Sequence, residues 1–110
     1  MTTNARVVGI SGELDLHSVD EASEALGRAI ADRDRRLVID LRRCSFIDST
    51  GLATIIHVTR PLRENGSRVA LVCPSGDVRK LLELAALNLT FPIHDRLEQA
   101  LEAPVEPQAG

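Results

Sequence analysis

Short apolar runs alternate along this chain with segments in which apolar residues recur every three or four positions. The runs lie at residues 6–11, 37–41 and 68–73 and are rich in Val, Ile and Leu. Runs of this length, bounded by turn residues, are typical of β-strands. A fourth run at residues 89–93 contains Pro92, which has no N–H to donate to a sheet, so we expect an edge strand there.

Four helices are predicted from the segments between and after these runs. In each segment the apolar residues recur with the spacing that places them on one face of a helix. The first helix begins at Ser18 with the sequence Ser-Val-Asp-Glu, which matches a capping box, a motif in which the Ser side chain binds the first turn. The predicted helices cover residues 18–30, 51–64, 77–87 and 95–101.

Strands that alternate with helices through short connections predict an α/β fold. The sheet is expected to be mixed and mostly parallel, with about four strands and right-handed crossovers. A chain of 110 residues is long enough for one such domain. We expect the domain to span residues 6–102, and residues 103–110, which contain two prolines, to form a disordered tail.

Composition and charge argue against a nucleic-acid-binding protein. The net charge is −3, and the 13 Lys and Arg residues are dispersed among 16 Asp and Glu residues, so no basic face is expected. Phe46 and Phe91 are the only aromatic residues, which are too few to stack the bases of a single strand.

The sequence also predicts a cytoplasmic protein that does not enter a membrane. The first six residues lack the order of charged and apolar residues that marks a secretory signal, and no uncharged run is long enough to cross a bilayer. Cys44 and Cys73 lie far apart and lack the spacing of a zinc or thioredoxin-like pair. We expect two buried, reduced thiols.

Sequence motifs that bind nucleotides or metal ions are absent. There is no Gly-rich phosphate loop, no dinucleotide-binding turn and no His-Glu-x-x-His sequence. His17, His57 and His94 are scattered along the chain, and we assign none of them to a metal ion. We therefore expect neither a metal nor a cofactor.

The most informative polar segment is Asp48-Ser49-Thr50-Gly51, which stands where the second predicted helix begins. The first turn of a helix has N–H groups without partners and a partial positive charge, so it can hold a phosphoryl group added to a hydroxyl there. Capping needs one short polar side chain, whereas this segment offers three, followed by a glycine that leaves the backbone uncovered. The segment is a candidate for covalent modification, and these considerations do not decide between Ser49 and Thr50.

A catalytic role for Ser49 is disfavoured. A Ser at a strand-to-helix turn is similar in position to the nucleophile of α/β-hydrolases, but that turn needs small residues two places before and after the Ser. Ile47 occupies the first of these places, and no His or oxyanion loop is evident. We expect no enzymatic activity.

Four segments of the chain occur together in one order. They are residues 12–15 (Gly-Glu-Leu-Asp), 38–41 (Val-Ile-Asp-Leu), 46–52 (Phe-Ile-Asp-Ser-Thr-Gly-Leu) and 68–73 (Arg-Val-Ala-Leu-Val-Cys). In this order and spacing they resemble the STAS family, specifically the bacterial anti-sigma factor antagonists. The resemblance covers roughly residues 7–102 and implies a single STAS-like domain.

The resemblance implies a protein that switches between partners. The unphosphorylated chain would bind an anti-sigma factor of the histidine-kinase-like ATPase type and so free a sigma factor. That anti-sigma factor, acting as a serine kinase, would phosphorylate Ser49 and end the binding, and a serine phosphatase would restore it. Asp15 matches the residue beside the phosphorylated Ser in such proteins, and Asp48, Thr50 and Gly51 would complete the partner-binding surface.

The chain departs from the family pattern at its beginning. Relatives carry an additional strand before the one that ends in Gly-Glu-Leu-Asp, and the six residues available here cannot supply it. The strand from Arg6 to Ser11 would then be an open edge, whose unpaired N–H and C=O groups favour pairing with another chain. A homodimer through this strand is the resulting hypothesis.

The family fold also serves in other roles. Accessory subunits of transport systems and scaffolds of stress-sensing assemblies share it, and either role is the alternative function for this chain. The binding partner distinguishes these possibilities, because only the anti-sigma factor antagonist requires a kinase-like anti-sigma factor.

Overall fold

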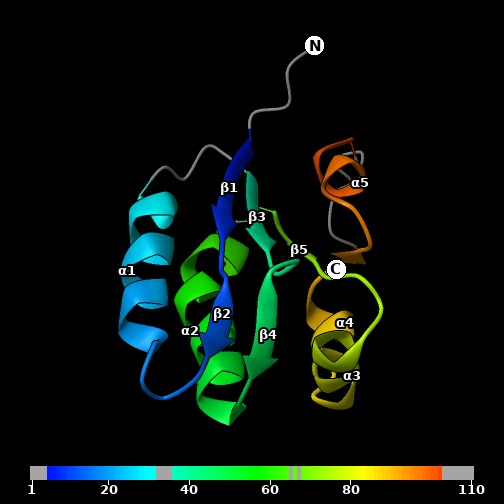
Figure 1. Ribbon diagram of the computed structural model, residues 1–110. Coiled ribbons are helices and arrows are strands. Elements are labelled where there is room, and N and C mark those ends of the chain that lie inside the picture. The colour runs from blue at the N-terminus through cyan, green and yellow to red at the C-terminus, as the bar shows by residue number, and fades with distance from the viewer. Residues whose placement is uncertain (1–4, 32–35, 65, 67, 103–110) are drawn as a thin grey trace.

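The computed structural model describes residues 5–31, 36–64, 66 and 68–102 (Figure 1). Its strands are β1 (Ala5–Gly9), β2 (Gly12–Leu14), β3 (Arg36–Asp40), β4 (Cys44–Ile47), β5 (Val69–Val72) and β6 (Ile93–His94). Its helices are α1 (Val19–Ile30), α2 (Ser49–Glu64), α3 (Asp77–Leu84), α4 (Leu87–Thr90) and α5 (Leu97–Glu102).

The strands form a four-stranded sheet in the order β1-β3-β5-β6 and a second sheet of β2 and β4, with every pair parallel. In Figure 1, β2 continues the line of β1, and β4 continues the line of β3. The first line is broken between Gly9 and Gly12, and a register shift follows between Gly12 and Glu13, where Gly12 adopts a φ of +76° that favours glycine. The predicted α/β class and mostly parallel sheet are confirmed.

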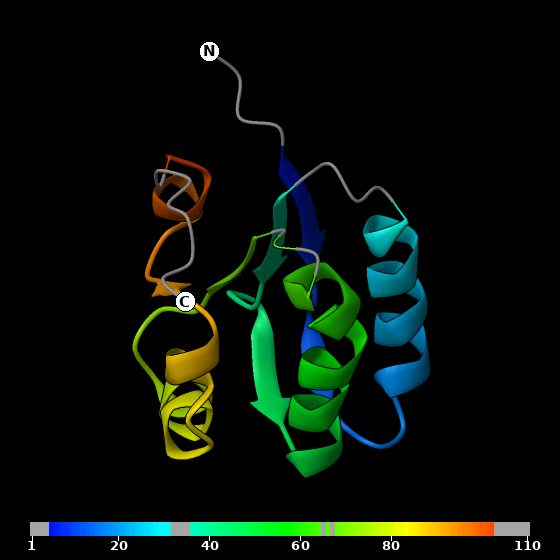
Figure 2. The same ribbon diagram turned by 180° about the vertical axis from the view of Figure 1, so that it is seen from behind.

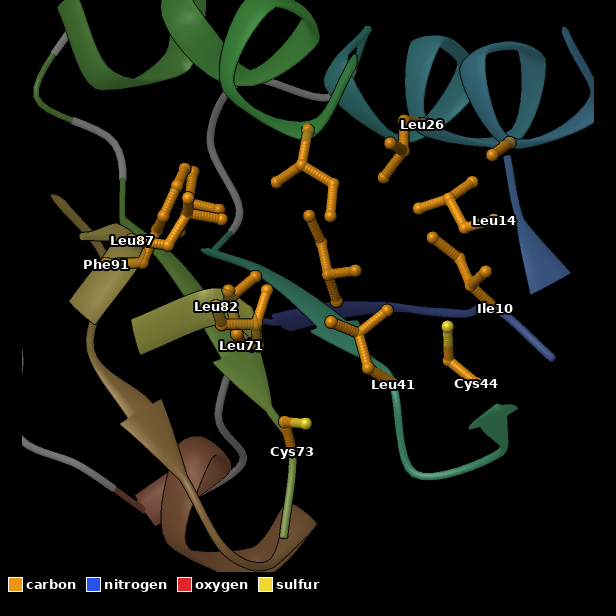
Figure 3. Packing of buried hydrophobic residues seen from close by; sticks show 14 of the residues in the cluster. Ile10, Leu14, Leu26, Leu41, Cys44, Leu71, Cys73, Leu82, Leu87 and Phe91 are labelled. Carbon is orange, nitrogen blue, oxygen red and sulfur yellow. The ribbon is translucent and has the colours of Figure 1, made fainter. Parts of the chain in front are cut away.

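The hydrophobic core lies mainly between the sheet and the helices that connect its strands. Leu26 of α1, Ile55 of α2 and Leu82 of α3 are completely buried in it. Figure 3 shows Ile10, Leu14 and Leu26 gathered at one end of this core and Leu82, Leu87 and Phe91 at the other. A smaller cluster on the opposite face consists of Val38, Val72 and Ala100, which places α5 on that face.

The predicted strands omit residues 12–14 and 44–47, and this part of the prediction is wrong. Both segments form short strands, β2 and β4, which pair with each other. The apolar content of these segments is low, since only Leu14 of β2 is buried and β4 buries only its two ends. Short strands with so few buried residues carry no period-2 signal, so only their mutual pairing defines them.

The edge strand predicted at residues 89–93 is also wrong for most of its length. Residues 87–90 form α4, a fifth helix where four were predicted, and the strand β6 is confined to Ile93–His94. A helical turn brings Leu87 and Phe91, four residues apart, into the same core. The helix ends at Thr90, and the next residue, Phe91, has a φ of −126° and a ψ of 140°, which suit a residue that precedes a proline.

The capping box predicted at Ser18 is wrong as well. Ser18 occupies the N-cap position of α1, but its side chain makes no capping hydrogen bond. The hydroxyl instead accepts a hydrogen bond from the N–H of Asp15 at 3.0 Å and donates to the carbonyl oxygen of Glu13. Ser18 therefore stabilises the loop between β2 and α1. The tail predicted at residues 103–110 lies outside the described residues.

Candidate functional site

The pairing of β2 with β4 brings two polar loops together at one end of the domain. Leu14 of β2 is in register with Ile47 of β4, and parallel strands end at the same edge of a sheet. Asp15 directly follows the first strand and Asp48 directly follows the second. Two segments that are more than 30 residues apart in the sequence thus become neighbours.

Asp48 caps α2 and also holds the loop that follows β2. Its Oδ1 accepts a hydrogen bond from the N–H of Gly51 at 2.9 Å, the arrangement of an N-cap residue and the third residue of a helix. Its Oδ2 accepts a hydrogen bond from the N–H of Leu16 at 3.2 Å. Its backbone N–H donates to the carbonyl oxygen of Leu14, also at 3.2 Å. A single residue therefore connects β2, the β2–α1 loop and α2.

Ser49 is the first residue of α2, and it is exposed. Its hydroxyl makes no hydrogen bond with any residue of the described part of the chain. The backbone N–H groups of Ser49 and Thr50 belong to the first turn, where no helical carbonyl is available to accept from them. The side chain of Ser49 is thus accessible to an enzyme, with two N–H donors of the helix end beside it.

Thr50 is less accessible than Ser49. It is half-buried, and its carbonyl oxygen accepts a hydrogen bond from the hydroxyl of Thr54 at 2.8 Å. The exposed side of α2 runs instead from Ser49 through Ala53 and His57 to Arg60, at spacings of three and four residues. The difference in exposure favours Ser49 as the modified hydroxyl.

Gly51 is buried, and the prediction that it leaves the backbone uncovered is wrong. A Cβ atom at this position would lie 2.4 Å from the carbonyl oxygen of Leu14 and 2.9 Å from the Cγ of the same residue. The absence of a side chain allows α2 to start directly against β2. The sequence shows that residue 51 is a glycine, but it does not show that β2 packs against it.

Asp15 lies in the neighbouring loop, as predicted, but its carboxylate serves that loop. The Oδ1 atom accepts hydrogen bonds from the N–H of His17 at 3.0 Å and from the hydroxyl of Ser18 at 3.2 Å. Among the described residues it makes no hydrogen bond with Ser49. Asp15 thus shapes the loop whose next residue, Leu16, is bonded to Asp48.

Two exposed apolar side chains next to these loops were missed by the sequence analysis. Leu16 is 66% exposed and Phe46 is 44% exposed, so both present apolar surface to the solvent. Leu16 follows Asp15, and Phe46 lies on β4 two residues before Asp48. In a sequence, an apolar residue beside a polar motif is normally interpreted as part of the hydrophobic core. The exposure of Leu16 could have been predicted only from its position among polar residues.

The remaining candidate groups do not form a reactive site. The residues that the structure describes contain no cluster of three or more His, Cys, Asp or Glu residues suited to a metal ion. Cys44 and Cys73 are buried free thiols, as predicted, and burial raises the pKa of both, that of Cys73 to about 11. Burial also lowers the pKa of His94. Within the described ranges, no helix has the length and apolar character needed to span a membrane.

Comparison with known proteins shows what this arrangement is similar to. An anti-sigma F factor antagonist of Paenibacillus polymyxa is 31% identical over 96 residues, which cover 86% of this chain and 82% of the relative. The crystal structure of an anti-sigma factor antagonist from Mycobacterium paratuberculosis superimposes with a TM-score of 0.83 at 31% identity and covers 91% of this chain and 85% of that one.

A third similar protein has been solved with a phosphoryl group. The Bacillus cell fate determinant SpoIIAA in its phosphorylated form is 26% identical, with a TM-score of 0.67, and the match covers 92% of this chain and 91% of that one. The family model described as the STAS domain matches residues 1–100. Because this match includes nearly the whole chain, the resemblance read from the sequence is confirmed, and the chain belongs to the STAS domain family.

Proposed function

We propose that this chain is an anti-sigma factor antagonist that phosphorylation of Ser49 switches off. The unphosphorylated form binds an anti-sigma factor of the histidine-kinase-like ATPase type in the cytoplasm, and the sigma factor held by that partner is released. The partner then acts as a serine kinase. The Oγ of Ser49 attacks the γ-phosphorus of its ATP, ADP leaves, and the hydroxyl proton is lost. A serine phosphatase later removes the phosphoryl group by hydrolysis.

The observation that carries this proposal is the exposed hydroxyl of Ser49 at the first position of a capped helix. The carboxylate of Asp48 already accepts a hydrogen bond from the N–H of Gly51, so the start of the helix is stable without a phosphate. The Ser49 side chain makes no hydrogen bond with the described residues that a kinase would have to break. The names of the similar proteins support the same function for this chain.

The partner surface that we propose centres on Ser49 and includes the two exposed apolar side chains. The bond between Asp48 and the N–H of Leu16 holds Leu16 beside the start of α2. Phe46 precedes the same helix on β4. Exposed apolar side chains next to polar groups are typical of surfaces that bind another protein.

The switch itself is electrostatic. A phosphoserine carries about −1.5 to −2 charges, and it would stand next to Asp48 and near the loop of Asp15. A doubly charged group about 6 Å from one carboxylate costs roughly 1.4 kcal/mol at a dielectric constant of about 80 and roughly 5.5 kcal/mol at about 20. The helix N-terminus offsets about 0.3–1 kcal/mol of this cost. A partner that fits the unmodified surface would have to remove water from the charged phosphoryl group in order to bind. Binding therefore weakens without a change of fold.

In this proposal the chain is the substrate of a kinase and not itself an enzyme. ATP is bound by the partner, so the chain needs neither a cofactor nor a metal ion. No residue is assigned a catalytic role.

The test is capture of the partner with a Ser49→Ala variant in the native cell, because a chain that cannot be phosphorylated should retain the kinase. The captured protein is then incubated with ATP and the unmodified chain, and mass spectrometry locates the phosphoryl group. We expect one group on Ser49, and a group on Thr50 would contradict the assignment. Capture of a transporter subunit or of a stress-sensing assembly would instead support the alternative function.

A further inference from the structure

We propose that β1 is a dimerisation edge through which two copies of this chain join their sheets. The edge lies at the opposite end of the domain from the start of α2, as Figure 1 shows, so the inference does not depend on the function of Ser49. It concerns a separate surface, formed by the backbone of residues 5–9.

One side of β1 is unpaired among the residues that the structure describes. The strand is at the end of the order β1-β3-β5-β6 and pairs with β3 in parallel. Gly9 is in register with Asp40, and the N–H of Ile10 donates to the carbonyl oxygen of Asp40 at 3.0 Å. In a strand the N–H and C=O of one residue point to the same side, and the side alternates along the chain. Those of Ala5, Val7 and Gly9 therefore point away from β3.

Apart from its short length and one charged side chain, this edge lacks the features that usually protect a strand from pairing. Residues 5–9 contain neither Pro nor Lys, and Arg6 is their only charged residue. Arg6 and Gly9 are exposed, and Val7 is 41% exposed. The backbone N–H and C=O groups along this edge are thus accessible, and the residue at its centre, Val7, is apolar.

The outward groups are complementary to a second copy of themselves. In an antiparallel pair centred on Val7, Val7 exchanges two hydrogen bonds with the second copy's Val7, and Ala5 exchanges two with the second copy's Gly9. Arg6 then stands opposite Val8 rather than opposite another Arg6, so no like charges face each other directly. The small residues Ala5 and Gly9 lie at the two ends, where they leave space for the backbones to approach.

Among the residues that the structure describes, the surroundings of the edge leave room for the second strand. In Figures 1 and 2 the first part of β1 extends beyond the end of α1. In the proposed antiparallel pair, the α1 helices of the two copies would therefore lie towards opposite ends of the paired strands. Where β1 and β2 do run beside α1, a hollow of about 300 Å³ separates Gly9 and Ile10 from Ala22 and Ala25. Helix α1 therefore does not cover the edge next to Gly9.

Such a dimer is expected to be weak and reversible, because a single pair of short strands buries much less surface than a stable interface needs. We expect the mass measured by sedimentation to rise from that of a monomer towards that of a dimer between about 10 µM and about 500 µM chain. Both Ser49 surfaces stay accessible in this dimer, since the start of α2 lies far from β1.

The test uses charge at the central residue. Val7→Lys places two like charges opposite each other, as does Val7→Glu, so each variant alone should be monomeric throughout this range. An equimolar mixture of the two should dimerise again, because opposite charges then face each other. Leu89→Lys is the matched control, since Leu89 is 83% exposed on α4, away from the edge, and this variant should dimerise like the unmodified chain.

Amide exchange provides a second readout that needs no variant. On dimerisation the N–H groups of Val7 and Gly9 should become protected with rising concentration, while that of Val8 should not change. A monomer at about 500 µM, a Val7→Lys dimer or a monomeric Leu89→Lys variant would each overturn the proposal. So would protection of Val7 and Gly9 in the monomer, because the chain itself would then cover its edge.

Discussion

The Oδ2 of Asp48 accepts a hydrogen bond from the backbone N–H of Leu16, 3.2 Å away, across a sequence separation of 32 residues. The other carboxylate oxygen caps α2 through Gly51. The start of the helix that carries Ser49 and the loop that exposes Leu16 are therefore held by one side chain.

Removal of the Asp48 carboxylate should separate its two roles. Asp48→Ala should lower the free energy of unfolding by about 1–2 kcal/mol, because α2 loses its cap and Leu16 its acceptor. Asp48→Asn retains one acceptor oxygen and should cost about 0.5–1 kcal/mol, since only one of the two bonds can persist. Urea unfolding measures both changes. If the Leu16 amide exchanges at the unmodified rate in the Ala variant, which has lost both acceptors, the proposed link between helix and loop is wrong.

Gly51→Ala should be among the most destabilising single substitutions in this chain. The new Cβ would meet the carbonyl oxygen of Leu14 at 2.4 Å, so α2 or β2 must shift, at a cost of about 2–3 kcal/mol or more. Gly27→Ala is the matched control. Gly27 lies within α1, and a Cβ added there has open space around it, with no neighbouring atom within 4 Å. This substitution should raise the free energy of unfolding by about 0.5–1 kcal/mol. Thermal or urea unfolding of the two variants should therefore move in opposite directions.

A negative charge at Ser49 should weaken the partner while leaving the fold intact. Ser49→Asp should bind the cognate anti-sigma factor about tenfold less tightly or worse, whereas the uncharged Ser49→Asn should bind almost like the unmodified chain. The stability of the Asp variant should change little, because the favourable effect of an acidic residue in the first turn, about 0.3–1 kcal/mol, is opposed by repulsion from Asp48, roughly 0.7 kcal/mol at a dielectric constant of about 80. Titration calorimetry measures the affinities. Equal affinities for the two variants would exclude charge as the basis of the switch.

Leu16 and Phe46 should contribute to binding far more than to stability. Replacing either with Ser removes an exposed apolar contact, and we expect the affinity for the anti-sigma factor to fall about fivefold or more. Leu89→Ser provides the control, because Leu89 is more exposed than both but lies on α4. A loss of affinity in this control comparable to that of Leu16→Ser would place the interface elsewhere.

Asp40 should make the protein more stable above pH 4 than below it. Hydrogen bonds from the Arg42 guanidinium, at 2.8–3.1 Å, lower the pKa of this carboxyl group. The contribution is present above the pKa of the unfolded chain, about 3.9, and is lost as the pH falls through the lower pKa of the folded state. Asp40→Asn should remove this part of the acid dependence when unfolding is followed between about pH 2 and about pH 6. An unchanged pH profile would show that the pair does not stabilise the fold.

Local patterns were sufficient for the strongest elements of the fold. The run at residues 37–41 predicted β3 because successive apolar residues suit a strand covered on both faces, and Leu37, Val38 and Ile39 are indeed buried. The alternation of such runs with amphipathic segments predicted the α/β class. The position of Ser49 at a helix start followed from Asp48 and Thr50 beside it, and the family followed from the order of four short motifs.

Contacts between distant segments decided the rest. No pattern in residues 12–15 or 44–47 predicts a strand, since β2 and β4 are defined by their pairing with each other. That pairing determines that Gly51 must lack a side chain, that Asp48 binds Leu16 and that the Asp15 carboxylate serves its own loop. The sequence by itself determined the fold class and the place of the Ser49 hydroxyl at a helix start, because both depend on local spacing. Only the tertiary structure decided which residues surround that hydroxyl and which strand edge is unpaired among the described residues, because both depend on which segments meet in space.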